Sequence, residues 1–301
     1  MIDFPVFAAE NSISFIENEP LSKHTSFKIG GPARYFVSVN SVDKLSALIK
    51  FLNSNKTPYF ILGNGSNLLV PDNGYNGVVV KLSGDFENLE ISGNIIKIGA
   101  AATLKKLTLA AKENSFTGVE FAYGIPGSVG GAIYMNAGAY GGEIKDVLYE
   151  VSAMDREGNV KVFSSEESAL SYRSSVFQKN DMIILSASFS LEKGDLNEIY
   201  NKMKTLLEKR KEKQPIEYPS AGSTFKRPEG YFAAALIEEC GLKGESVGGA
   251  EVSVKHSGFI INKKDATAND VLSLIKKVKD VVYEKKGVVL EPEIKIIEEV
   301  N

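Results

Sequence analysis

The sequence predicts an α/β protein built from two or three domains. Its 301 residues, 43% of them hydrophobic, are enough to bury one large core or several smaller ones. Strand-like apolar runs at 59–63 and 77–82 follow a helical period at Leu45, Leu48, Ile49 and Leu52, and this β-α-β rhythm is typical of α/β architecture. Two glycine-rich runs, 61–70 and 124–141, interrupt the regular pattern and are the first candidates for a ligand site.

The segments 1–82 and 83–192 each contain one capped helix. Ser41 precedes the helix that carries Leu45, with Asp43 in its first turn, and Thr103 precedes a second helix. In the last of the strands predicted here, apolar residues alternate with Ser186, Ser188 and Ser190, so we expect one face of it to be solvated. The predicted strands cover 89–92, 95–100, 147–154, 159–163 and 182–191.

The last third begins with a polar, lysine-rich helix over 195–213, whose charges indicate a solvated surface. A short helix over 231–240 and a strand over 258–262 follow. Thr267 and Asp270 form a capping box for the most periodic helix of the chain, which Gly287 ends. A final apolar strand is predicted over 288–297. We place domain boundaries after 82, after 192 and after 291, with the segment 292–301 as a candidate to return to the first domain.

Charge and composition limit the possible partners. The net charge is −3 and no basic stripe occurs, which argues against nucleic-acid binding. No apolar run approaches about 18 residues and no secretion signal is evident, so we expect a cytoplasmic protein without a membrane partner. Cys240 lies on an apolar helical face and is interpreted as a core residue. The two histidines, His24 and His256, lack a second ligand at metal spacing, so no metal site is predicted.

The glycine run Gly124–Gly141 contains six glycines, which allow backbone N–H groups to converge on phosphate oxygens. Glycines this dense also occur in bulged turns and tight backbone crossings, and that alternative stays open. The other run, GNGSN, follows a strand but lacks the third glycine and the helix of a nicotinamide Rossmann site, and no Walker lysine follows it. Two separated loops of this kind suit one extended dinucleotide such as FAD. The serine turn SAGST is not the G-x-S-x-G elbow of a hydrolase.

Six ordered blocks carry a resemblance over nearly the whole chain: KHTSFKIGGPA (23–33), LGNGSNLLV (62–70), GIPGSVGGAIYMNAGAYG (124–141), YRSSVF (172–177), AGSTFKRP (221–228) and LEPEI (290–294). Together they resemble the UDP-N-acetylenolpyruvoylglucosamine reductases of peptidoglycan synthesis, in the shorter of two forms. The resemblance implies a two-part FAD-binding unit of the vanillyl-alcohol-oxidase type, here 1–82 and 83–192, and a smaller α/β substrate domain, here 193–291. This sequence departs from the family pattern at Ala234 and Ala235, where a Gly-Lys pair is expected, and at Ser171, where a larger residue is usual.

The resemblance also implies the site residues and partners. FAD, bound non-covalently, and NADPH as reductant are expected, and the protein is expected to act as a monomer on UDP-N-acetylglucosamine enolpyruvate. The catalytic residues implied are Arg173, Ser223 and Glu293. The cofactor-binding residues implied are Gly63, Asn64, Gly65, Ser66, Asn67, Leu68, Gly124, Pro126, Gly127, Ser128, Gly130, Gly131 and Ile133. The substrate-binding residues implied are Asn136, Tyr172, Arg173, Lys226 and Arg227.

These residue types suit reduction of an enolpyruvyl ether. Negative charge moves from the α carbon into the substrate carboxylate as hydride adds to the β carbon, and the planar fork of Arg173 suits a carboxylate. Ser223 would give the proton to the α carbon with help from Lys226, Arg227 or water, and Glu293 would orient the site or hold a proton. Two alternatives stay open: a flavin oxidase of the same fold, and a nucleotide-binding module without catalysis.

Overall fold

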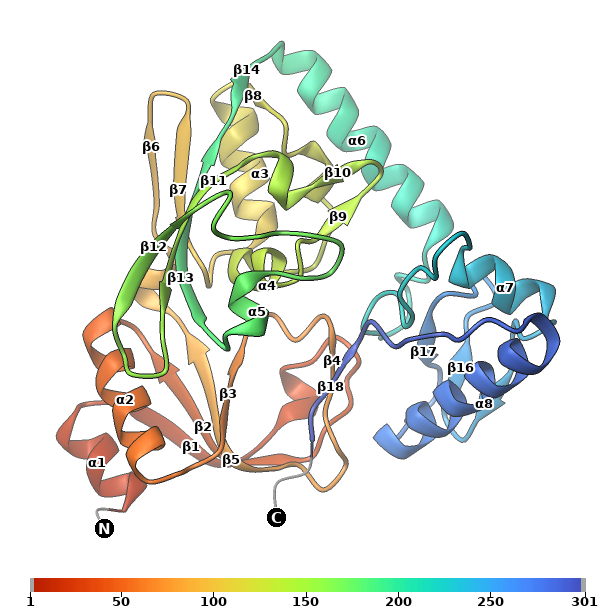
Figure 1. Ribbon diagram of the computed structural model, residues 1–301, viewed down its shortest axis with the longest axis horizontal. Coiled ribbons are helices and arrows are strands. Elements are labelled where there is room, and N and C mark those ends of the chain that lie inside the picture. Colours follow the sequence, from red (N-terminus) through yellow and green to blue (C-terminus); the bar gives the residue numbers. More distant parts are fainter. Residues whose placement is uncertain (1–2, 299–301) are drawn as a thin grey trace. The chain divides into compact units, whose positions relative to one another are not determined.

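The computed structural model describes residues 3–298, and the chain divides into two compact units (Figure 1). The first unit contains residues 3–17, 35–64 and 77–209, and the second contains 18–34, 65–76 and 210–298. Each unit is therefore assembled from segments that are far apart in the sequence. Within residues 3–298, no helix combines the length and the apolar character needed to cross a membrane.

The N-terminal sheet has the strand order β1-β2-β5-β3, with β3 and β5 parallel. Helix α2 buries Leu45, Leu48, Ile49 and Leu52 in the core of the first unit, and the Ser41 hydroxyl accepts the Lys44 N–H at its start, as predicted. The elements of this region are α1 (Phe4–Glu10), β1 (Ser14–Pro20), β2 (Pro32–Val39), α2 (Val42–Ser54), β3 (Tyr59–Leu62), β4 (Leu68–Leu69) and β5 (Tyr75–Leu82).

A five-stranded antiparallel sheet, in the order β12-β11-β13-β7-β6, forms the middle of the first unit. Helix α4 contacts both β13 and β7, and α3 contacts β7. The elements are β6 (Leu89–Ser92), β7 (Ile95–Gly99), α3 (Leu104–Glu113), β8 (Phe116–Thr117), α4 (Val129–Tyr134), β9 (Gly138–Ala139), β10 (Gly142–Glu143), β11 (Leu148–Met154), β12 (Val160–Ser164), α5 (Val176–Lys179), β13 (Ile183–Ser190) and β14 (Glu192–Lys193).

The prediction of a half-solvated last strand was wrong. Strand β13 is the central strand of the five, and seven of its eight residues are buried or half-buried. Ser188 is buried, and its hydroxyl donates to the Glu150 carboxylate on β11. A sequence alternation of serine and apolar residues therefore marks two covered faces here, because small hydroxyl groups can hydrogen-bond inside a sheet.

The second unit has its own hydrophobic core around α8 and a three-stranded antiparallel sheet, β15-β16-β17. The Thr267 and Asp270 capping box and the left-handed Gly287 at the end of α8 are as predicted, and Cys240 is buried in this core. The elements are α6 (Leu196–Lys213), which begins in the first unit, α7 (Ala233–Glu239), β15 (Ser246–Val247), β16 (Ala250–Val252), β17 (Ile260–Asn262), α8 (Ala268–Lys286) and β18 (Lys295–Ile296).

The predicted final strand over 288–297 was too long. Only Lys295–Ile296 forms a strand, β18, and it pairs in parallel with β4. Pro292 lies before it. Residues 291–293, on both sides of this proline, pair with 224–226, whereas 295–297 bond to 67–69. Residues 295–297 thus bond to residues 67–69, which lie within the N-terminal 82, while 299–301 lie outside the described residues.

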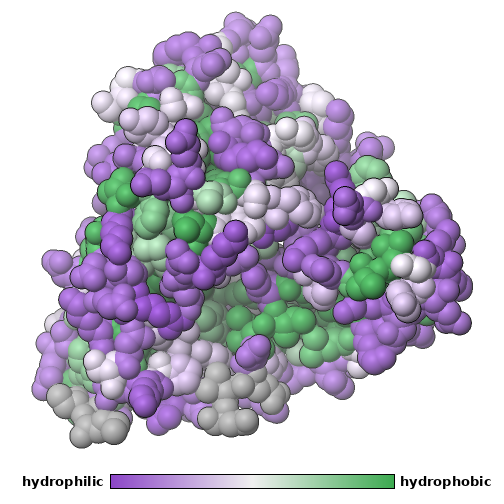
Figure 2. All heavy atoms as spheres, viewed as in Figure 1, coloured by the Kyte–Doolittle hydropathy of each residue, from purple (hydrophilic) through white to green (hydrophobic). Residues whose placement is uncertain are grey.

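Helices α1, α4 and α5 have no counterpart in the prediction. Helix α4 lies inside the second glycine run, where glycines at 130 and 131 weigh against a helix on propensity alone. On the face of the molecule seen in Figure 2, hydrophilic residues predominate. The other predicted strands and helices lie within about two residues of those observed.

Candidate active site

The two glycine runs meet in the first unit at Gly63 and Ser128. A Cβ added to Gly63 would lie 2.6 Å from the Ser128 hydroxyl oxygen, so a larger residue cannot fit unless Ser128 moves. Ser128 is buried, caps α4 and accepts the Gly131 N–H at 3.2 Å. Gly131 itself is exposed. Where the two runs meet, the backbone at Gly131 is therefore open to a ligand.

Lys81 on β5 is a member of this site that sequence reasoning missed. Its ammonium group donates to the Gly63 carbonyl oxygen, and burial lowers its pKa. Because a trans peptide points its C=O and the next N–H in opposite directions, this bond also sets the direction of the Asn64 N–H. The sequence feature that could have identified Lys81 is its position directly after the apolar run Val78–Val80, where a lysine in a buried strand needs a partner.

In the second unit, the remainder of the first glycine run packs against the block around His24. A Cβ on Gly65 would lie 2.0 Å from the His24 carbonyl oxygen, and Gly65 has a φ of +62°, so only glycine fits there. The Ser26 N–H donates to the Gly65 carbonyl at 3.1 Å, and the Ser26 hydroxyl donates to the Ser220 carbonyl at 2.6 Å. The block at 23–33 therefore connects the first glycine run to the serine turn.

The serine turn and the terminal carboxylate segment lie side by side in the second unit. The Glu293 N–H donates to the Thr224 carbonyl at 2.8 Å, the Lys226 N–H donates to the Glu291 carbonyl at 2.9 Å, and Phe225 and Pro292 form a bridge. Ser223 and Glu293 are both half-buried. Two of the three predicted catalytic residues are thus held by one short antiparallel pairing.

Asn67 extends this cluster to the glycine run. Its side-chain amide donates to the Glu293 carbonyl at 3.4 Å, and its own carbonyl accepts the Lys295 N–H at 2.9 Å. Burial, together with the charge of Lys226, lowers the pKa of Lys295. The predicted cofactor loop and the predicted catalytic carboxylate are therefore joined within the second unit.

The two predicted cationic substrate ligands each have a partner. The Lys226 ammonium lies 3.1 Å from the Glu291 carboxylate, and both side chains are well exposed. The Arg227 guanidinium lies 4.5 Å from the centre of the exposed Phe232 ring. Neither contact is buried, so an anionic ligand can displace it at small cost.

Arg173 lies in the first unit, half-buried, in a tight turn closed by reciprocal backbone hydrogen bonds between Ser171 and Ser174. Its guanidinium lies 5.0 Å from the centre of the exposed Tyr172 ring and donates to the Asn136 carbonyl oxygen at 3.4 Å. The structure thus brings Arg173, Tyr172 and Asn136 together.

The side chains of Asn136 and Ile133 are both enclosed by the protein. Ile133 is fully buried in the core of the first unit. Asn136 is also fully buried, and its amide bonds to three protein groups. We therefore assign neither side chain to direct contact with a ligand.

The residues present fit an FAD group. The glycine positions at 63 and 65 admit backbone where a Cβ would collide, and such backbone suits a pyrophosphate.

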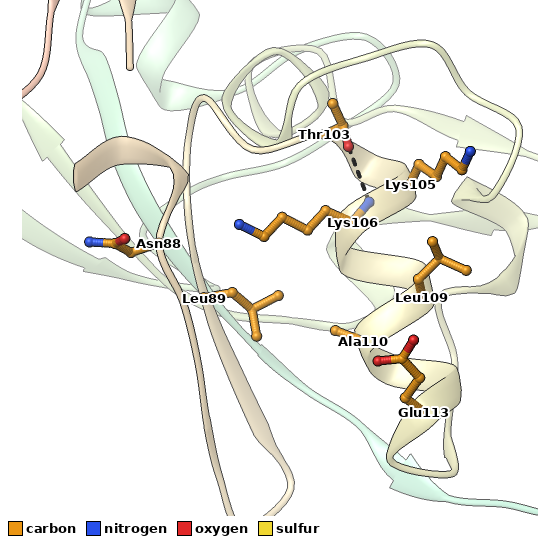
Figure 3. Close-up of a pocket in the computed structure, with 8 residues that line it drawn as sticks. All are labelled: Asn88, Leu89, Thr103, Lys105, Lys106, Leu109, Ala110 and Glu113. Atoms are coloured by element: carbon orange, nitrogen blue, oxygen red, sulfur yellow. Dashed lines mark hydrogen bonds between the residues drawn. The ribbon is translucent and has the colours of Figure 1, made fainter. Parts of the chain in front are cut away.

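A separate open pocket of about 720 Å³ lies between α3 and the segment that leads into β6 (Figure 3). It is lined by Asn88, Leu89, Thr103, Lys105, Lys106, Leu109, Ala110 and Glu113, and it contains none of the predicted site residues.

Comparison with known proteins finds relatives for both parts of the chain. The family model for the C-terminal domain of UDP-N-acetylenolpyruvoylglucosamine reductase matches residues 214–297, and a model for an FAD binding domain matches 33–164. The reductase of Caldanaerobacter subterraneus subsp. tengcongensis is 54% identical over 282 residues, which cover 94% of this chain and 93% of the relative. The chain belongs to the UDP-N-acetylenolpyruvoylglucosamine reductase family.

Other members of the reductase family support the assignment. The reductase of Lachnoclostridium phytofermentans is 52% identical over 289 residues, which cover 94% of this chain and 93% of the relative. The crystal structure of the reductase from Thermus caldophilus matches with a TM-score of 0.81 and 35% identity, covering 95% of this chain and 99% of that one. The resemblance found in the six sequence blocks and the predicted FAD-binding fold class are therefore confirmed.

Proposed function

We propose that this chain is an NADPH-dependent flavoenzyme that reduces the enolpyruvyl group of UDP-N-acetylglucosamine enolpyruvate to give UDP-N-acetylmuramate, a precursor of peptidoglycan. Family membership over 94% of the chain supports this activity. The observation that carries the assignment of residues is the pairing of the Ser223 turn with the Glu293 segment in a protein of this family. FAD is the cofactor and NADPH the reductant.

The backbone of the two glycine runs would hold the FAD, with Gly63 and Ser128 shaping the cradle in the first unit. When bound, FAD supplies hydride transfer from NADPH to the enolpyruvyl double bond. Lys81 holds the Gly63 carbonyl by a hydrogen bond, and the Asn64 N–H, which points the opposite way across the same peptide, would serve the ligand.

The chain's own residues manage charge and protons. Arg173 pairs its planar fork with the substrate carboxylate, where negative charge accumulates as the β carbon receives hydride. Ser223 gives its hydroxyl proton to the α carbon, and Lys226 stabilises the alkoxide that this leaves. Glu293, held beside the serine turn by its backbone, orients the donor. Lys226, Arg227 and Tyr172 contact the substrate.

The proposal extends to a monomeric, cytoplasmic enzyme that serves cell-wall growth, and through it cell shape and division. Both reactants are small molecules with charged phosphate groups, which do not cross a membrane unaided. The enzyme is therefore expected in the compartment that holds both reactants, which we propose is the cytoplasm.

Substitution of Ser223 tests the assignment. Ser223→Ala removes one half-buried hydroxyl from a turn, so the stability should change by no more than about 0.5 kcal/mol. Oxidation of NADPH should continue at nearly the same rate, while reoxidation of the flavin by the enolpyruvyl substrate should slow by several orders of magnitude. Stopped-flow absorbance at the flavin band separates the two half-reactions.

Ser223→Cys is the matched control, because a thiol with a pKa of about 8.5 can give a proton where the geometry allows. It should recover part of the rate. Reoxidation of Ser223→Ala at nearly the wild-type rate would show that another group is the acid, with Glu293 the next candidate. Absence of any turnover by the wild-type protein with the enolpyruvyl substrate would favour a flavin oxidase instead.

A further inference from the structure

The Asn136 side chain links two segments of the first unit to the end of α4. Its Nδ2 donates to the Glu143 carboxylate at 2.9 Å and to the Ser171 carbonyl at 3.1 Å, and its Oδ1 accepts the Lys145 N–H at 3.0 Å. The side chain is fully buried. The opposite orientation of the amide would place an oxygen against two acceptors, so these partners fix which atom is the nitrogen.

Glu143 is a carboxylate in this arrangement. Its burial opposes ionisation, but hydrogen bonds from Lys145 and Asn136 and the charges of Lys145 and Arg173 outweigh burial and lower its pKa. Glu143 belongs to the hairpin of β9 and β10, where it pairs with Gly138. The hairpin is therefore anchored to Asn136 through a charged acceptor, which makes the hydrogen bond stronger than one between neutral groups.

The Ser171 carbonyl is the contact that reaches the catalytic arginine. It accepts from the Asn136 amide and from the Ser174 N–H, which closes the turn that contains Arg173. The Arg173 guanidinium in turn donates to the main-chain carbonyl of Asn136 at 3.4 Å. Asn136 thus holds the turn by its side chain and the arginine head group by its backbone.

The backbone at both residues is unusual. Asn136 has a φ of +43° and Arg173 a φ of +53°, in the left-handed region that few residues other than glycine occupy. Asparagine tolerates this region better than most residues, which suits position 136. Arginine has no such preference, so the conformation at Arg173 must be held by surrounding contacts.

From these contacts we infer that Asn136 is a positioning residue for the reaction, which sets the Tyr172 and Arg173 turn through the Ser171 carbonyl and does not itself bind the substrate. This inference rests on the proposed role of Arg173. It explains why a polar side chain within the second glycine run is buried, with its hydrogen bonds directed to the protein.

Asn136→Asp is the direct test, because aspartate keeps the size and the acceptor for Lys145 but turns the two donated hydrogen bonds into acceptor–acceptor contacts. The loss of the hydrogen bond from this buried amide to the Ser171 carbonyl should slow flavin reoxidation by the enolpyruvyl substrate by roughly ten- to a hundredfold. Flavin reduction by NADPH should change less than about twofold, because Arg173 is not needed for that step. Stopped-flow absorbance of the FAD-loaded enzyme measures both rates.

The double variant Asn136→Asp with Arg173→Ala separates positioning from general damage. If Asn136 acts through Arg173, Asn136→Asp adds no further slowing of reoxidation in the Arg173→Ala background, although its effect on thermal stability persists. Equal slowing in both backgrounds would overturn the inference. If Arg173→Ala itself left reoxidation unchanged, the proposed role of Arg173 would fail instead, and the two failures are therefore distinguishable.

Two further variants complete the design. Asn114→Asp changes a matched asparagine at the end of α3, whose amide donates to the Ala110 carbonyl, and it should leave both half-reactions unchanged.

Asn136→Asp with Glu143→Gln restores a donor opposite position 136 in case the single variant does not fold. This pair should regain stability toward that of Glu143→Gln alone but keep slow reoxidation, since the Ser171 carbonyl still faces a carboxylate. Parallel recovery of stability and reoxidation would show that Asn136 is only structural.

Discussion

Arg173 combines a left-handed backbone with a side chain that we propose binds the substrate carboxylate. Its φ of +53° costs roughly 1–3 kcal/mol in a residue other than glycine, and the Ser171 and Ser174 hydrogen bonds hold it there. The Tyr172 ring lies 5.0 Å from the guanidinium. If Arg173 binds the substrate as proposed, these contacts hold it in place beforehand, so that little side-chain freedom is lost on binding.

Arg173→Lys should show what the planar fork contributes. Lysine keeps the charge but loses the pair of parallel donors, so transition-state stabilisation should fall by about 2–4 kcal/mol in flavin reoxidation by the enolpyruvyl substrate. Flavin reduction by NADPH should remain close to the wild-type rate. Stopped-flow traces in which both half-reactions slow equally would point to a folding or flavin-binding defect.

At the scale of elements, the first glycine run takes its shape from contacts to residues distant in the sequence. Gly63 faces Ser128 and Lys81 in the first unit, whereas Gly65 faces His24 in the second. A loop that changes its partner within three residues cannot adopt its conformation from local propensity. The glycines allow this, because each lacks the Cβ that would collide.

Gly63→Ala should weaken FAD binding by placing a methyl group 2.6 Å from the Ser128 hydroxyl oxygen. An overpacked site of this kind costs about 1–3 kcal/mol, which corresponds to a rise of roughly 5- to 150-fold in Kd. Titration of the apoprotein with FAD, followed by flavin fluorescence, measures the change.

Ser128→Ala in the Gly63→Ala background is the matched control. It removes the oxygen in conflict and leaves the Ser128 Cβ at 3.8 Å, so affinity should recover to that of Ser128→Ala alone. If the double variant binds FAD no better than Gly63→Ala, the steric explanation is wrong.

At the scale of the whole molecule, FAD should be held without a covalent bond. The glycine runs at 63–68 and 124–131 contain neither histidine nor cysteine, and the one cysteine, Cys240, is buried in the core of the second unit. Heat denaturation followed by centrifugation should leave the yellow colour in the supernatant, and colour retained in the pellet would contradict this. Added FAD should also raise the Tm, by an amount equivalent to about 2.7 kcal/mol at a free concentration of 100 Kd.

The sequence by itself determined the features that depend on neighbours in the chain. Ser41, Thr103 and Thr267 cap the helices that follow them because a hydroxyl reaches the N–H groups of the first turn. The glycine runs and the ordered blocks identified the reductase family and its cofactor, since a ligand that needs bare backbone requires glycine at particular positions. The burial of Cys240 followed from helical periodicity.

The tertiary structure alone decided the features that depend on contacts between distant segments. It covered both faces of β13, which alternation had assigned half to solvent, and it divided the segment around Pro292 between two partners. It also buried Asn136 and turned its amide to the protein, where the motif had suggested a substrate contact. In each case the local pattern allows more than one environment, and residues distant in the sequence take part in the choice. At Asn136, for example, the Ser171 carbonyl, 35 positions away, accepts one of the amide hydrogen bonds.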